Sequence, residues 1–395
     1  MTAPDRVAAE LNSQGLASLR SGDWAAAARS FEGAAARDPK SSALWRNLAT
    51  AYRAGGDGPG ELRALDAALD ADRRDILAWI RKAETHQRLD QRGDAFVAWN
   101  GALSLARMAG GVPDAIAALL EQGRAFVDEG TGRIREAADA ALSPLRAELD
   151  ETAARRTRAF VDHAMGGRSI YTNQCAGLHY PFLPADEFFD RRHFPWFDAV
   201  EARAPGIRAE LEALLADPGE ALRPYVRMEK GLPDNIWSGL DNSLDWGACF
   251  LWEYGEPNRT VLDRCPETAA ALGEIPAAPI PGRSPSAFFS LLKPKKRIPP
   301  HTGVTNTRAI VHLPLIVPPG CGFRVGGETR EWVEGRAFAF DDTIEHEAWN
   351  DGDRLRAVLI FDVWNPHLSP AEQEAIVRYY AAADSTGFGP ARGTG

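Results

Sequence analysis

Residues 301–317 read HTGVTNTRAIVHLPLIV, a polar turn that leads into a β-type run rich in Val, Ile and Leu. Strand alternation places Arg308, Ile310 and His312 on one face of this run, and Ala309 and Val311 on the other. A polar side chain on an otherwise apolar face needs a partner, because burying it unpaired costs about 2–7 kcal/mol. The stretch therefore predicts a strand whose polar face lines a pocket.

Further β-type runs surround this stretch in the second half of the chain. Turn residues such as Pro318-Pro319-Gly320 and Asp351-Gly352-Asp353 separate them. Many short strands at this spacing predict a β-sandwich or a barrel. The expected strands are residues 287–293, 308–317, 322–325, 336–341 and 355–364.

The first hundred residues have a different pattern, a repeat with a period of 34. This spacing relates Trp45 to Trp79, and it also relates Phe31, Leu65 and Trp99 to one another. Such a period is typical of tetratricopeptide repeats, whose helix pairs bury their apolar faces by stacking on their neighbours. Ala34, Ala68 and Ala102 follow the same spacing.

These patterns predict a multidomain α and β protein. We expect a tetratricopeptide solenoid over residues 1–110, capping and connector helices over 111–166, and a β domain over 167–395. Gly130-Thr131-Gly132 is expected to separate two of the connector helices.

The composition is that of a globular protein, with 45% hydrophobic and 25% charged residues among 395. A formal net charge of −10 argues against a nucleic-acid partner, which requires a basic surface. The four cysteines are widely spaced, as is typical of free thiols in a reducing compartment. No apolar stretch approaches the ~20 residues that a membrane span needs. We expect a cytoplasmic protein with no membrane span.

Two histidines, His301 and His346, are candidate metal ligands that can meet across neighbouring strands. Arg356, ten positions after the second histidine, can hold a carboxylate. The usual non-haem iron triad has a carboxylate two positions after its first histidine, and here that position is Gly303. The pattern indicates a non-haem iron site in which one expected ligand is missing.

Four motifs resemble the aspartyl/asparaginyl β-hydroxylase family: residues 301–308, 332–335, 340–347 and 362–366. Residues 178–184 and 194–196 resemble the entry segment of its bacterial members, so the resemblance covers residues 169–370. It implies a double-stranded β-helix, a cupin-like jelly roll. It also implies an oxygenase that uses Fe(II), O2 and 2-oxoglutarate.

Carried over by position, the resemblance implies that His301 and His346 bind iron and that water takes the place left by Gly303. Asp342, four residues before His346, matches a carboxylate that orients an iron-bound water. Asp341 is expected to cap a turn.

The resemblance also implies the residues that bind 2-oxoglutarate. Arg356 matches the arginine that pairs with its distal carboxylate, Ser290 and His312 match the helpers of that arginine, and Trp246 matches an aromatic of the pocket wall. Alternatives remain open: His312 as a core histidine bonded to a backbone carbonyl, and Ser290 as an ordinary strand serine. A zinc-binding cupin would use the same two histidines but would not need Arg356 on a pocket face.

The substrate side departs from the family pattern. Members that hydroxylate Asp or Asn in epidermal-growth-factor-like domains have Arg, Gln and Arg where this chain has Asp241, Ala248 and Ile310. Loss of both cations removes the partner of a substrate carboxylate. Arg308 either pairs with an acidic neighbour or helps to recognise the substrate.

We expect a dioxygenase that hydroxylates an unactivated C–H bond of a peptide or protein side chain, of the Asp/Asn β-hydroxylation type by resemblance. The tetratricopeptide repeats would recruit the protein partner. Two alternatives remain: a hydroxylase of a small or lipid-like molecule, and an adaptor whose β domain is catalytically idle.

Overall fold

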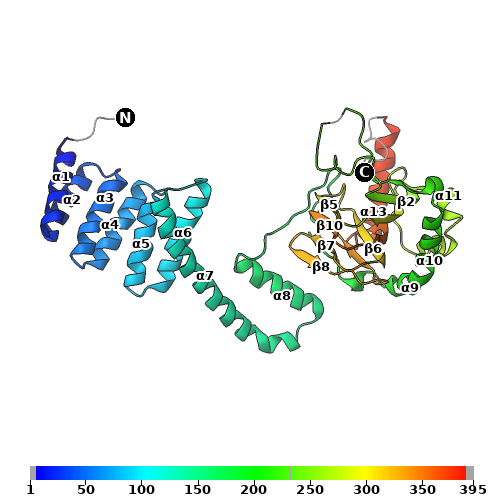
Figure 1. Ribbon diagram of the computed structural model, residues 1–395, viewed down its shortest axis with the longest axis horizontal. Helices are drawn as coiled ribbons and strands as arrows, with labels where there is room; N and C mark the ends of the chain where they lie inside the picture. The colour runs from blue at the N-terminus through cyan, green and yellow to red at the C-terminus, as the bar shows by residue number, and fades with distance from the viewer. Residues whose placement is uncertain (1–5, 232, 388–395) are drawn as a thin grey trace. The chain divides into compact units, whose positions relative to one another are not determined.

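The computed structural model describes residues 6–231 and 233–387 and separates the chain into two compact units, Met1–Asp150 and Glu151–Gly395 (Figure 1). The division falls before helix α8 (Glu151–Ala164), earlier than the β domain's predicted start at residue 167. In α8, Arg155 forms an ion pair with Glu328 at 2.6 Å and donates to the Phe188 carbonyl at 2.7 Å. These bonds explain why α8 belongs to the second unit.

The first unit is a series of helices that pack on one another in consecutive pairs joined by short turns (Figure 1). Asp23, Asp57 and Asp75 cap three of the helices, each accepting a hydrogen bond from a backbone N–H of the first turn. The helices are α1 (Arg6–Ser21), α2 (Trp24–Arg37), α3 (Ser42–Ala54), α4 (Gly58–Ala71), α5 (Ile76–Arg88), α6 (Arg92–Met108) and α7 (Asp114–Leu142), followed by a 3-10 turn (Ser143–Ala147).

The residues that repeat every 34 positions form the core of this unit. Phe31, Leu65 and Trp99 are all buried, as are Ala34, Ala68 and Ala102. A side chain at Gly15 would begin 2.6 Å from the ring of Phe31, so glycine allows α1 and α2 to approach closely. The predicted solenoid of helix pairs is therefore confirmed.

The predicted break at residues 130–132 is wrong, because α7 runs without interruption from Asp114 to Leu142. Gly130 has a packing role instead: a Cβ there would lie 2.9 Å from the ring of Phe96. Glycine inside a helix costs only about 1 kcal/mol, which tertiary packing readily offsets.

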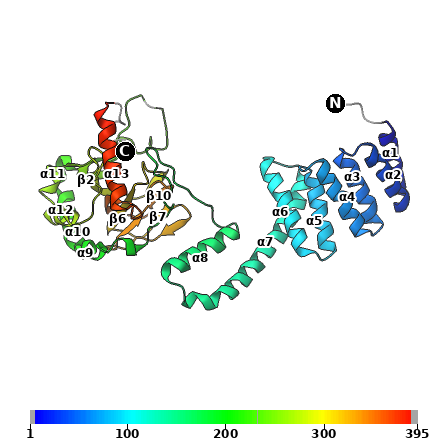
Figure 2. The same cartoon turned by 180° about the vertical axis from the view of Figure 1, so that it is seen from behind.

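The second unit contains two antiparallel β-sheets, seen from both sides in Figures 1 and 2. The larger sheet has the strand order β1 (Arg223–Pro224), β2 (Trp246–Glu253), β4 (Ala287–Leu292), β11 (Arg356–Trp364), β6 (Arg308–Ile316) and β9 (Phe338–Phe340), with β3 (Glu256–Pro257) paired to β2. The smaller sheet has the order β5 (Lys296–His301), β10 (His346–Asn350), β7 (Cys321–Val325) and β8 (Glu328–Arg330).

Two apolar cores lie on opposite faces of the larger sheet. One, which includes Val311, Leu313 and Phe361, packs the sheet against helices. The other, which includes Val358 and Phe323, joins the two sheets. Besides α8, the α-helices of this unit are α9 (Phe197–Ala202), α10 (Ala204–Ala216), α11 (Arg259–Leu262), α12 (Pro266–Gly273) and α13 (Pro370–Ser385).

Alternation along β6 follows the sequence-based prediction. Ala309, Val311 and Leu313 are buried in the core that faces the helices, whereas Ile310 and His312 face the smaller sheet. None of the helices in the described part of the chain combines the length and the apolar composition that a membrane span requires.

Candidate active site

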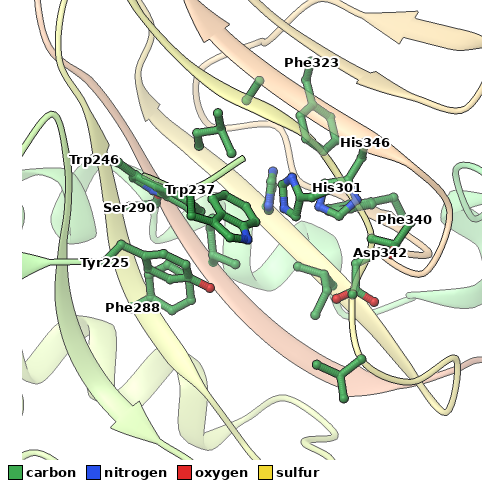
Figure 3. Close-up of a pocket in the computed structure, with 18 of the residues that line it drawn as sticks. Tyr225, Trp237, Trp246, Phe288, Ser290, His301, Phe323, Phe340, Asp342 and His346 are labelled. Carbon is green, nitrogen blue, oxygen red and sulfur yellow. The ribbon is translucent and has the colours of Figure 1, made fainter. Parts of the chain in front are cut away.

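A cavity of about 260 Å³ opens between the two sheets and is lined by residues of β2, β4, β5, β6, β10 and β11 (Figure 3). Residues far apart in the sequence meet there because the two sheets face each other. Every site residue predicted from the sequence lines this one cavity: Trp246, Ser290, His301, His312, Asp342, His346 and Arg356.

His301 and His346 face each other at one side of the cavity (Figure 3). They are direct partners in the pairing of β5 with β10, and their ring centroids are 4.0 Å apart. Nδ1 of His301 is 2.7 Å from the Pro299 carbonyl oxygen, and Nδ1 of His346 is 3.0 Å from that of Ile344. Because a carbonyl oxygen can only accept, each Nδ1 carries the hydrogen, which leaves both Nε2 lone pairs available.

Burial keeps both imidazoles neutral. It lowers the pKa of His301, and it lowers the pKa of His346 well below its usual value, with the neighbouring His301 adding to the effect. Neutral imidazole is the form that binds a metal. Within the described residues, no group of three or more His, Cys, Asp and Glu side chains is arranged to hold a metal ion.

Asp342 lies beside Gly303, the position where a ligand carboxylate would be expected. The Gly303 N–H donates to the Asp342 carbonyl at 2.6 Å, and a Cβ at residue 303 would overlap the Asp342 carboxylate. Burial, followed by the charge of Asp341, raises the pKa of Asp342 to about 7. Glycine at 303 therefore makes room for a carboxylate that comes from a different loop.

Replacing Gly303 with alanine is expected to weaken metal binding by about 10–100-fold, because the new methyl group must displace the Asp342 carboxylate. Electron paramagnetic resonance titration with Mn(II) measures this effect. The matched control is Gly273→Ala, since a Cβ at Gly273 meets no other atom within 4 Å. Equal Mn(II) affinity in the wild type and the Gly303 variant would show that the close approach has no role in metal binding.

Arg356 lies in the cavity wall with only 1% of its surface exposed. Its guanidinium donates to Ser290 Oγ at 3.4 Å and lies 5.1 Å from the centroid of the Trp332 ring. Within the described residues, no carboxylate lies in ion-pair range of Arg356, and its Nε has no hydrogen-bond partner. Burial lowers the pKa of Arg356 to about 10, so the group is still cationic at neutral pH. A buried cation with one neutral partner leaves room for an anionic ligand.

Ser290 and His312 complete the polar part of this wall. Ser290 Oγ accepts from both Arg356 and Trp246 Nε1, so its own hydroxyl hydrogen is left to donate. His312 Nδ1 is buried without a hydrogen-bond partner within the described residues, which does not support the alternative of a core histidine bonded to a carbonyl. Burial and the nearby Arg356 hold the pKa of His312 well below its usual value.

Most of the remaining lining of the cavity is apolar. Asp342 and Arg356 are the two charged side chains among the described lining residues, and Ile310 lines the wall where the family pattern has a cation. Asp241 lies outside the lining and instead accepts hydrogen bonds from the Met228 N–H and the Asn242 side chain. Ala248 is buried on β2. The apolar and aromatic lining residues include Tyr225, Trp237, Phe288, Val304, Phe340 and Ile360.

Arg308 pairs with an acidic neighbour, which is the first of the two roles predicted for this residue. Its guanidinium lies 2.6 Å from the carboxylate of Asp362, and both side chains are buried. The Ser286 N–H also donates to Asp362, at 3.0 Å.

The Asp362→Ala variant is expected to lower the free energy of unfolding of the second unit by about 3–5 kcal/mol, because it removes the Asp362 carboxylate from the buried ion pair with Arg308. Denaturant unfolding followed by near-ultraviolet circular dichroism measures the loss. Glu374→Ala, which breaks an exposed ion pair with Arg378, is the control and should change little. A loss no larger than that of the control would contradict the structural role of the pair.

Sequence reasoning missed three aromatic residues around the site. Trp237 packs edge-on against His301 at 4.8 Å, Tyr225 stacks on Trp246 at 3.9 Å, and Trp332 stacks on His312 at 5.5 Å. Trp237 and Trp332 lie outside strands, where no periodicity marks a buried position, whereas Tyr225 follows the two-residue strand β1. Only the resemblance at residues 332–335 offered a signal for Trp332.

The fold and the site together define a β-sheet domain with a paired-histidine pocket and a buried arginine. The family model described as Aspartyl/Asparaginyl beta-hydroxylase matches residues 201–366. This part of the chain belongs to the aspartyl/asparaginyl β-hydroxylase family.

Individual relatives agree with this assignment. The chain is 33% identical to the human aspartyl/asparaginyl beta-hydroxylase over 188 residues, which cover 46% of this chain and 24% of that protein. It is 34% identical to the ornithine lipid ester-linked acyl 2-hydroxylase of Rhizobium tropici over 197 residues, which cover 49% of this chain and 66% of that protein. The chain thus spans about a quarter of the length of the human relative.

Among solved structures, the Sgt2 tetratricopeptide domain of Aspergillus fumigatus is similar to 32% of this chain. The match covers 83% of that domain at 22% sequence identity, with a TM-score of 0.29.

Proposed function

We propose that the second unit is a double-stranded β-helix oxygenase that uses Fe(II), O2 and 2-oxoglutarate to hydroxylate an unactivated C–H bond. One observation carries this proposal: the buried Arg356 guanidinium, without a carboxylate partner within the described residues, lies in the same cavity as two histidines with free Nε2 atoms. A metal-binding site alone needs the histidines but not the buried cation. A site for a metal and a dicarboxylate needs both.

The donor set fits Fe(II). Imidazole nitrogens suit non-haem iron, and the backbone carbonyls of Pro299 and Ile344 fix the tautomers of His301 and His346 so that each Nε2 would be free to bind the metal. Gly303 has no side chain to act as a third protein ligand, so water would take that place on the metal. Asp342, whose carboxylate lies against Gly303, would orient that water by a hydrogen bond.

The opposite wall fits the distal carboxylate of 2-oxoglutarate. Arg356 can bind it through two parallel N–H donors, Ser290 through its free hydroxyl hydrogen, and His312 through a ring nitrogen. Trp246 holds the Ser290 hydroxyl in place at 3.1 Å. When bound, iron with 2-oxoglutarate and O2 supplies the oxidising equivalent, and 2-oxoglutarate leaves as succinate and CO2. The protein's part is to position the substrate C–H and to exclude water.

For the substrate, we propose a peptide or protein side chain, recruited through the tetratricopeptide repeats of the first unit in a cytoplasmic setting. Stacked helix pairs present an extended surface that suits an extended partner.

A small or lipid-like substrate is the second candidate, and the largely apolar lining of the cavity favours it. Ile310 stands where a cation would bind a substrate carboxylate, and Arg356, assigned above to 2-oxoglutarate, is the one cation among the described lining residues. The Rhizobium tropici relative is an ornithine lipid ester-linked acyl 2-hydroxylase, which is consistent with an alkyl substrate. A catalytically idle adaptor is disfavoured because His301, His346 and Arg356 are all present in one cavity.

Product mapping tests these candidates directly. The full chain with Fe(II), 2-oxoglutarate and 18O2 is incubated with a soluble protein pool or with a lipid extract, and the products are analysed by mass spectrometry. We expect protein products that contain one 18O atom with the wild type but not with His301→Ala. Labelled products only in the lipid extract would replace the first candidate with the second.

A further inference from the structure

A short segment, residues 173–177, crosses both loops that form the metal side of the cavity. It lies outside the part of the chain that matches the family model, which begins at residue 201. The backbone N–H of Gln174 donates to the Thr343 carbonyl at 2.7 Å, that of Ala176 to Gly303 at 3.1 Å, and that of Gly177 to Val304 at 2.8 Å. We call these five residues the strap.

The side chain of Asn173, the first residue of the strap, closes a buried network. Its Nδ2 donates to Asp341 Oδ2 at 2.7 Å and to Thr343 Oγ1 at 2.9 Å. The other oxygen of Asp341 accepts from the Thr343 N–H at 3.0 Å and from the Thr343 hydroxyl at 2.6 Å, which confirms the turn-capping role expected for Asp341. Asp342, the residue that projects toward the metal side, lies inside this turn.

The strap therefore joins two loops that lie far apart in the sequence. One loop follows β5 and contains Gly303, and the other precedes β10 and contains Asp342. The chain just after the strap is fixed as well, because Asn306 exchanges two hydrogen bonds with the backbone of Tyr180, at 2.7 and 2.9 Å. A rigid bridge between the loops would fix how closely the Asp342 carboxylate approaches Gly303.

We propose that the strap is a positioning element for the metal site and that Asn173 is its essential side chain. The inference rests on the proposed function, since it assigns Asp342 a place beside the bound metal. Asn173 is a positioning residue, because its contacts are with Asp341 and Thr343 and not with the two histidines. Its effect reaches the metal through the Asp341–Thr343 turn that carries Asp342.

Mn(II) binding to the full chain, followed by electron paramagnetic resonance, tests this role. We expect Asn173→Ala to weaken Mn(II) affinity about tenfold, the lower end of the effect typical of residues that orient a metal's surroundings. Asn173→Asp is isosteric, replaces the donating amide by an acceptor that faces Asp341, and should weaken binding at least as much. The control is Thr172→Val, whose side chain is exposed and adjacent in sequence, and which should leave the affinity unchanged.

A double-mutant cycle separates positioning from a general loss of structure. If Asn173 acts through Asp342, Asn173→Ala should weaken Mn(II) binding less than about twofold in an Asp342→Ala background. A full tenfold loss in that background would overturn the proposal, as would wild-type affinity in both Asn173 variants. If Asn173→Ala does not fold, the isosteric Asn173→Asp variant is compared in the wild-type and Asp342→Ala backgrounds instead. Absence of His346-dependent Mn(II) binding in the wild type would instead refute the proposed metal site itself.

Discussion

Replacing Arg356 with alanine is expected to weaken 2-oxoglutarate binding by about 2–4 kcal/mol. The guanidinium is buried, with Ser290 as its hydrogen-bond partner, so a bound dicarboxylate would lose its charge partner in a cavity that offers no other cation among the described lining residues. Anaerobic isothermal titration of the Mn(II)-loaded protein with 2-oxoglutarate measures the change.

The matched control for this prediction is Arg354→Ala. Arg354 carries the same charge two positions away, but its side chain is exposed, so its loss should leave 2-oxoglutarate binding nearly unchanged. Arg356→Lys keeps the charge but loses the two parallel donors, and should give an intermediate affinity. If Arg356→Ala bound 2-oxoglutarate as tightly as the wild type, Arg356 would not be the carboxylate partner.

The His346→Ala variant is expected to lose metal-dependent turnover almost completely. His346 is one of the two paired histidines proposed to hold Fe(II), and removing it leaves only His301 of that pair. The variant should also lose high-affinity Mn(II) binding, which is measured independently of any substrate.

His163→Ala is the control, because His163 is an exposed histidine of α8. It should bind Mn(II) and turn over as the wild type does. Wild-type Mn(II) affinity in His346→Ala would exclude this histidine as a ligand, whatever the activity of the variant.

The polar face of the larger sheet could be predicted from the sequence because strand alternation is a local property. In β6 and β11 the apolar runs are long enough to mark the strands, so His312 and Arg356 could be assigned to faces. Alternation alone could not predict that His301 pairs directly with His346, because the sequence reveals neither the register nor the sheet to which each strand belongs. The resemblance supplied that link, and the structure brings the two rings to 4.0 Å.

Of the smaller sheet, only β7 was predicted from the sequence. The composition and length of β5, β8 and β10 explain why these strands were missed. β5 contains Pro299 and Pro300, which remove backbone donors and normally argue against a strand, but β5 is an edge strand and needs hydrogen bonds on one side only. β10 reads HEAWN, too short and too polar to stand out. β8 has three residues.

The strap and Trp237 could not be predicted either. Residues 173–177 form no strand of their own, and their contacts depend on backbone N–H groups, which leave no trace in the residue types. The side chain of Asn173 bonds to Asp341 and Thr343, but asparagine in a loop is ordinarily read as a turn residue. Long-range hydrogen bonds of this kind become visible only in the folded chain.

The central claim is that the cavity uses Fe(II) and 2-oxoglutarate for oxidation, and its most direct test is release of 14CO2 from 1-14C-labelled 2-oxoglutarate. The assay compares the wild type and His346→Ala, with and without Fe(II), in the presence of a broad pool of proteins and lipids. We expect Fe(II)-dependent release from the wild type and background release from His346→Ala. Equal release from the two proteins would contradict the account.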